Sequence, residues 1–225
     1  MKNIFNFIYL ALVFSCSQPD SGNRDKVNND VKANPVTVSS KTPDTISHKK
    51  RTDAIVNRII DTTLLMNIST EILKSIKSKN YNKLATFIHP QDGVRFSPYA
   101  NISLNDRKFL GSELIQLAKQ SKPIDWGSSW DEGTELLTIG QYFKKFVYDV
   151  DFLNAELKSI NKFHSQGTDL NNITDVYPGC DVTEFFFSGF DEKNGGMDFR
   201  GLRLVFKLLD KHPFLIAIVH DEWTP

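Results

Sequence analysis

Near its C-terminus the chain has a run of side chains that suit acid–base chemistry and ligand contact, namely His220, Asp221, Glu222 and Trp223. In an extended strand alternate side chains share a face, so His220 and Glu222 lie on one side, and Asp221 and Trp223 on the other. A histidine or carboxylate that enters an apolar cavity can transfer a proton, because desolvation shifts its pKa. His220 and Asp221 are therefore candidate catalytic residues. The competing interpretation is a polar strand end whose hydrogen bonds are satisfied.

An aspartate and two tyrosines extend this candidate catalytic set. Asp149 is a second possible base, and Tyr148 or Tyr142 is a possible hydrogen-bond donor to an oxyanion. If the segment is extended, Asp149 and Asp151 share a side and could bind a cation weakly, whereas a solvated turn is the default interpretation. The sequence offers candidates for acid–base chemistry without a recognised catalytic motif.

Candidate binding residues lie outside this set. Arg95, Arg200 and Arg203, near Asp198, could line a mouth that binds a carboxylate through bidentate hydrogen bonds, with Trp223 as an aromatic contact. The alternative is that these arginines form structural ion pairs with neighbouring acidic residues.

Several classes of function find no support in the sequence. The five histidines show no metal-binding spacing, no pair of closely spaced cysteines occurs, and no nucleophile elbow or phosphate-binding glycine loop is present. Basic and acidic side chains balance at 27 each, which does not favour nucleic acid. We expect no metal, no cofactor and no nucleic-acid partner.

The N-terminus predicts export. Lys2 precedes an apolar run over 4–14 that only Asn6 interrupts, and Ser15 precedes Cys16. These are the parts of a secretory signal peptide. Eleven residues of helix rise only about 16 Å, roughly half of a ~30 Å hydrocarbon core, so the run is too short to span a membrane. We expect residues 1–15 to be removed as a signal peptide.

The segment Val13-Phe14-Ser15-Cys16 resembles the bacterial lipobox. The resemblance implies a diacylglycerol thioether on Cys16, cleavage before that cysteine, and acylation, for example by palmitate, of the new amino terminus. Ser17 stands where an Asp would resemble the inner-membrane retention signal. The expected product is a lipoprotein of the bacterial cell envelope, on the outer membrane, at its periplasmic or surface side.

The next segment, 17–52, predicts a disordered linker. It consists mainly of polar residues and proline and has no helical or strand period, so it cannot bury enough apolar area to offset the entropy of ordering. Residues 53–225, with 23 acidic and 19 basic side chains, form the expected single domain.

Hydrophobic spacing predicts helices in the first part of this domain and one short strand. We expect a helix over 53–78, a short helix from Tyr81 to His89-Pro90, a strand over 94–98, a helix from Asn105 or Asp106, and a helix over 138–148. Residues 121–136 have the composition of a structured loop, and 149–178 allow no assignment.

The C-terminal third predicts an antiparallel meander of strands over 182–190, 199–209 and 214–223. In the last strand strict alternation places Phe214, Ile216, Ile218 and His220 on one face. Both faces are apolar up to Val219, which indicates a sheet that is covered on both sides.

This element order resembles the cone-shaped fold of nuclear-transport-factor-two-like and ketosteroid-isomerase-like domains. The stretches 89–98, 195–206 and 218–224 also resemble a group of uncharacterised bacterial secreted proteins and lipoproteins. The resemblance implies an α+β domain in which N-terminal helices pack on a curved antiparallel sheet, and it implies no particular activity.

Two functions remain open. The first is a membrane-tethered module that binds a small ligand or an envelope protein. The second is an enzyme of the isomerase or dehydratase sort, in which a group among His220, Asp221, Asp149 and Tyr148 acts inside an apolar cone.

Overall fold

The structure is a computed structural model that describes residues 61–129, 133–164 and 171–223. These residues belong to one compact unit that spans 48–225. The expected signal peptide, Cys16 and the linker lie outside the described residues. Among the residues described, no helix is both long enough and apolar enough to cross a membrane.

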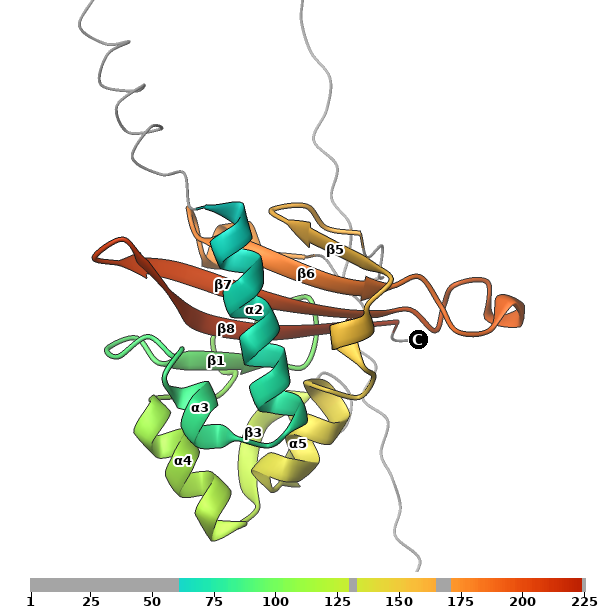
Figure 1. Ribbon diagram of the computed structural model, residues 1–225. Coiled ribbons are helices and arrows are strands. Elements are labelled where there is room, and N and C mark those ends of the chain that lie inside the picture. The colour runs from blue at the N-terminus through green and yellow to red at the C-terminus, as the bar shows by residue number, and fades with distance from the viewer. Residues whose placement is uncertain (1–60, 130–132, 165–170, 224–225) are drawn as a thin grey trace, which may run out of the picture. The chain divides into compact units, whose positions relative to one another are not determined.

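The main sheet has six strands in the order β2-β1-β8-β7-β6-β5 (Figure 1). Neighbouring strands are antiparallel except β1 and β8, which run parallel. The expected C-terminal meander is confirmed as β6, β7 and β8. The strands are β1 Val94–Ser97, β2 Lys108–Phe109, β5 Leu157–Ile160, β6 Asp181–Phe187, β7 Arg200–Leu209 and β8 His212–Glu222.

Five helices accompany the sheet within the described residues. The helix α2 runs across one face of the sheet, and α3, α4 and α5 lie together beyond β1 (Figure 1). The expectation of a mixed α+β fold with a mostly antiparallel sheet is therefore confirmed. The helices are α2 Thr62–Lys77, α3 Tyr81–Ala85, α4 Gly111–Gln120, α5 Ile139–Phe146 and α6 Ile173–Val176, with single 3₁₀ turns η1 Phe152–Asn154 and η2 Glu192–Asn194.

The helix starts follow from capping side chains. Asp61 accepts a hydrogen bond from the Thr63 amide at 2.9 Å, and its backbone is not helical, so α2 begins at Thr62. The earlier part of the expected helix over 53–78 falls outside the described residues. Thr138 and Gln141 form a reciprocal capping box that starts α5 as expected.

The helix expected from Asn105 or Asp106 begins only at Gly111. The Asp106 carboxylate instead accepts hydrogen bonds from the Ser97 hydroxyl at 2.6 Å and the Ser103 amide at 2.9 Å. This closes a turn before β2, since a short acidic side chain competes with the helix for backbone donors.

The expectation of a loop over 121–136 is wrong. Strands β3 Ile124–Ser129 and β4 Gly133–Leu137 pair antiparallel as a separate two-stranded sheet. Trp126 is buried there, stacks on Tyr142 with ring centroids 3.8 Å apart, and donates from Nε1 to the Leu137 carbonyl at 2.8 Å. Trp126 thus joins the hairpin to α5. The glycines in this stretch had favoured a loop over a pair of strands.

A β-bulge corrects the expected faces of β8. Val205 pairs with Ala217 but Phe206 pairs with Leu215, so Ile216 is the extra residue. Leu215 therefore packs in the same core as Ile218, and Ile216 packs with Ala217 in the other core. The expectation that Ile216 shares a face with Ile218 and His220 is wrong, because strict alternation stops at the bulge.

Two cores confirm that the sheet is covered on both sides. The face that α2 covers, here the helix face, carries the larger core, and the Ser69 hydroxyl bonds to that of Thr183 at 2.9 Å across it. The opposite face, here the far face, carries a smaller core of Ile102, Ile173, Val182, Val205, Ile216, Ala217 and Val219.

Candidate functional site

Strand register brings three charged side chains together on the far face. Glu184 lies opposite Arg203, and Asp221 lies opposite Gly201, which precedes Arg203 by two residues in β7. A Cβ at Gly201 would lie 3.3 Å from the Asp221 Cβ and 3.7 Å from a Phe186 ring carbon. Because Gly201 has no side chain, Asp221 and Phe186 can pack against its backbone.

These residues, Glu184, Arg203 and Asp221, form the buried ion cluster. Arg203 Nε lies 2.9 Å from Glu184 Oε1, and its Nη2 lies 2.6 Å from Asp221 Oδ2. The side chain of Arg203 is 0% exposed, that of Glu184 1% and that of Asp221 2%. The ring of Phe163 lies 5.1 Å from the guanidinium carbon. Two carboxylates thus share one guanidinium away from water.

His164 links the buried ion cluster to the surface. Its backbone amide donates to Glu184 Oε2 at 2.6 Å, and its ring Nδ1 lies 2.9 Å from the same oxygen. The ring also stacks over Phe186, with centroids 6.0 Å apart. One side chain therefore contacts both a buried carboxylate and the wall of a pocket.

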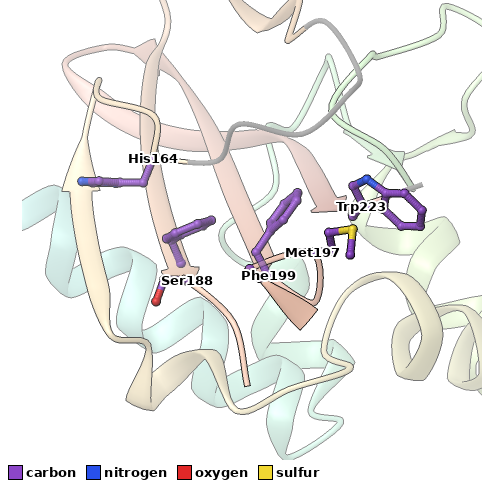
Figure 2. Close-up of a pocket in the computed structure, with 8 residues that line it drawn as sticks. His164, Ser188, Met197, Phe199 and Trp223 are labelled. Atoms are coloured by element: carbon purple, nitrogen blue, oxygen red, sulfur yellow. The ribbon is translucent and has the colours of Figure 1, made fainter. Parts of the chain in front are cut away.

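That pocket has a volume of about 390 Å³ and opens on the far face beyond the buried ion cluster. Figure 2 shows His164 and Ser188 at one side, and Met197 and Trp223 at the other, with Phe199 between them. The lining residues are His164, Phe186, Ser188, Gly195, Gly196, Met197, Phe199 and Trp223. We call it the far-face pocket.

Four of the eight lining residues are apolar or aromatic, namely Phe186, Met197, Phe199 and Trp223. Phe186 and Phe199 are buried, with ring centroids 5.9 Å apart. Met197 and Trp223 remain 53% and 39% exposed. A ligand that entered would therefore cover apolar surface that now meets water.

Two carboxylates adjoin lining residues, Glu156 through hydrogen bonds and Asp198 through its place in the chain. Glu156 accepts hydrogen bonds from the amide and hydroxyl of Ser188 at 3.0 and 2.8 Å, which hold the pKa of Glu156 below its ordinary value. Asp198 stands between the lining residues Met197 and Phe199 in the chain. A hydrogen bond from Asn194 is the main cause that lowers the pKa of Asp198. Both groups are therefore anionic near neutral pH.

On the helix face His220 belongs to a separate network, here the His220 network. Its Nε2 lies 3.2 Å from Asp149 Oδ1, and its Nδ1 lies 3.3 Å from the Pro98 carbonyl oxygen. Arg200 donates from Nε to Asp149 Oδ2 at 2.7 Å and approaches Glu222 Oε2 at 3.2 Å. Burial raises the pKa of Asp149, but the hydrogen bonds and charges of His220 and Arg200 outweigh it and hold that pKa below the ordinary value.

The His220 network has the spacing of a metal site but not its charge. Donor atoms of Asp149, His220 and Glu222 all lie within 4.8 Å of one another. The Arg200 guanidinium, however, pairs with both carboxylates. A metal ion would have to displace that cation, so the arrangement fits an ion-pair network better than a metal centre.

The structure divides the candidate catalytic residues between the two faces. It brings His220 and Asp149 together, and it places Asp221 in the buried ion cluster on the far face. Tyr148 donates to Asp151 Oδ1 at 2.6 Å, and burial together with this bond raises the pKa of Tyr148. The four groups do not converge on one cavity.

The candidate binding residues are likewise separated. Arg95 donates to the carbonyls of residues 103, 104 and 106 and to the Tyr177 hydroxyl, which fixes the chain after β1. Arg200 lies on the helix face and Arg203 in the buried ion cluster, so the three arginines form no common mouth. Trp223 does line the far-face pocket.

Sequence reasoning missed most of the far-face pocket. One usable signal was Glu184, an acidic residue in the middle of the aromatic β6, whose alternation places it on the same face as Phe186. The approach of His164 carried no signal in the sequence, because 20 residues separate it from Glu184.

Comparison of the chain with protein-family models, with curated proteins and with solved structures gave no match. The functional interpretation therefore depends on the chemistry of the site.

Proposed function

We propose that this chain is a ligand-binding module whose site is the far-face pocket, held at a bacterial envelope membrane by lipid on Cys16. The observation that carries the binding proposal is the pocket itself, of about 390 Å³ with buried phenyl rings at its floor and Trp223 at its rim. This volume falls within the ordinary range for small-molecule sites, which combine apolar contacts with a few polar groups.

Exposed apolar side chains around the opening support the proposal. Met197 and Trp223 line the far-face pocket, and Phe190, 56% exposed, lines a smaller neighbouring pocket of about 240 Å³. Ser188 and Gly196 belong to both pockets, so the two adjoin. Apolar surface gathered around a hollow favours a binding site over a chance exposure.

The buried ion cluster would keep this site in shape before any ligand arrives. Glu184 holds His164 through two contacts and is itself held by Arg203. A wall fixed in this way loses little conformational freedom on binding, which favours affinity.

The tether and the finer fold belong to the same proposal. The lipobox-like Val13-Phe14-Ser15-Cys16 supports a lipid anchor, and the polar linker over 17–52 would let the domain stand clear of the bilayer. We also propose that the domain is of the cone-shaped, nuclear-transport-factor-two-like type. Support comes from α2, which packs on one face of a mostly antiparallel six-stranded sheet (Figure 1).

The binding proposal can be tested on the purified full chain in a sugar-headed detergent. The indole N–H signals of the tryptophans would be followed by NMR during titration with two neutral, water-soluble probes, benzyl alcohol and 3,3-dimethylbutan-1-ol. We expect a saturable shift of the Trp223 signal. The Trp126 signal serves as an internal control and should stay fixed, because that indole is buried in the helix-face core.

A matched pair of variants sharpens this test. Met197→Ala removes an exposed apolar side chain at the rim, and Leu136→Ala removes one, 65% exposed, on β4 of the other sheet. We expect Met197→Ala to weaken binding about threefold to tenfold, by the transfer free energy of the lost contact, and Leu136→Ala to leave it unchanged. Failure of both probes to shift the Trp223 signal saturably would overturn the proposed function.

One observation favours the enzymatic alternative, namely the contact of 3.2 Å between buried His220 and Asp149. Neither residue lines the far-face pocket. If the alternative were correct, His220→Gln would abolish turnover of a bound ligand. Under the binding proposal His220→Gln leaves the affinity for both probes unchanged.

A further inference from the structure

We infer that the far-face pocket selects organic cations, and that its ligand presents a substituted ammonium group to the aromatic lining. This inference rests on the proposed function and adds the chemical class of the ligand. It follows from two features, the kind of surface that lines the pocket and the sign of the charge behind that surface.

The lining is suited to a cation that has few hydrogen-bond donors. Phe186, Phe199 and Trp223 bring three aromatic rings to one hollow. Met197 lies beside Trp223 (Figure 2). The face of an aromatic ring carries partial negative charge. It therefore attracts a substituted ammonium group that lies within about 6 Å of the ring centre. Methyl groups on the nitrogen would also cover the apolar rim.

The charge around the pocket has the matching sign. The buried ion cluster sets two carboxyl groups against one guanidinium. Glu156 bonds to the lining residue Ser188, and Asp198 adjoins the lining residues Met197 and Phe199. Arg200 also adjoins Phe199, but its guanidinium is paired with Asp149 and Glu222. The lining itself, as the structure describes it, contains no lysine or arginine.

These charges also indicate what the pocket should reject. A carboxylate or phosphate in the hollow would meet aromatic faces and anionic neighbours, with Arg203 already engaged by Glu184 and Asp221. A neutral ligand of the same shape would gain the apolar contact but not the electrostatic one. Charge should therefore discriminate among ligands of equal size.

Three probes of similar shape separate the effect of ligand charge on affinity from the effect of apolar contact. Choline carries a trimethylammonium group, 3,3-dimethylbutan-1-ol replaces the nitrogen by carbon, and 3,3-dimethylbutanoate carries a negative charge. Each would be titrated into the full chain in the same detergent while the Trp223 indole signal is followed. We expect choline to bind about tenfold more tightly than the neutral isostere, and the anion to bind most weakly.

A matched pair of charge variants locates the source of the preference. Glu156→Gln keeps an acceptor for Ser188 and removes the nearby charge. Glu71→Gln removes an exposed carboxylate of α2, the helix that covers the opposite face of the sheet. We expect Glu156→Gln to weaken choline about twofold to fivefold without affecting the neutral isostere, and Glu71→Gln to change neither.

The outcomes separate this inference from the proposed function. If the neutral isostere or the anion bound as tightly as choline, the inference would be overturned while the binding function would stand. If no probe produced a saturable shift, both would fail. A further titration with glycerophosphocholine distinguishes a lipid headgroup from a free cation as the source of the ammonium group. Binding as tight as that of choline supports a lipid headgroup as ligand, and loss of binding supports a free cation.

Discussion

Arg203 bridges two buried carboxylates, and its removal would take the guanidinium away from both. We expect Arg203→Leu to lower the free energy of unfolding by about 3–5 kcal/mol, the usual cost of breaking a buried ion pair on one side. Urea unfolding followed by circular dichroism measures this loss.

The matched control replaces the whole buried ion cluster. Glu184→Met and Asp221→Leu added to Arg203→Leu should recover most of the lost stability, because a buried ion cluster and an apolar cluster of similar volume are often close in free energy. A cost below about 1 kcal/mol for Arg203→Leu alone would show that the two carboxylates find other partners.

Asp149 makes folding sensitive to acid. Its folded-state pKa lies below the ordinary value of 3.8, so it contributes stability that is complete above that value and lost as the pH falls through the lower, folded-state pKa. We expect the urea midpoint of the protein to drop more steeply below about pH 4 than that of Asp149→Asn. Parallel curves for the two proteins would contradict the role of His220 and Arg200 in charging Asp149.

At the scale of elements, the capping box sets where α5 begins. Thr138 Oγ1 accepts from the Gln141 amide at 3.3 Å, and Gln141 Oε1 accepts from the Thr138 amide at 2.9 Å. We expect Thr138→Ala to cost about 0.5–2 kcal/mol in thermal or urea unfolding, and Thr138→Ser to cost much less because it keeps the acceptor. Equal losses for both variants would indicate that the methyl group of Thr138 matters more than its hydroxyl.

Helices and strands could be predicted where neighbouring residues determine them. They could not be predicted where contacts with distant parts of the chain determine them. The capping box of α5, the place of Pro213 near the start of β8 and the meander follow from neighbouring residues. The hairpin of β3 and β4 depends on Trp126 finding Tyr142, and the bulge at Ile216 depends on the register with β7. Alternation alone could not reveal either.

The same limit applies to the candidate site. Alternation along β8 correctly separated His220 from Asp221, and the structure assigns them to different networks on opposite faces of the sheet. Their partners Asp149 and Arg203 come from distant parts of the chain. The far-face pocket combines His164 with the segment that joins β6 to β7, so only tertiary structure could define it.

At the scale of the whole molecule, the proposed role depends on Cys16. Each acyl CH₂ that enters a bilayer contributes about 0.8 kcal/mol, and two or three chains make attachment effectively permanent. A serine hydroxyl cannot form the thioether, so we expect Cys16→Ser to lose incorporation of radioactive palmitate and to leave the membrane pellet after a salt wash. The other cysteine provides the matched control, because Cys180→Ser makes the same atomic change in the folded domain and should leave both readouts intact. Cys16→Ser protein that still sedimented with membranes after the wash would contradict the lipid tether, while leaving the far-face pocket to be judged by its own titrations.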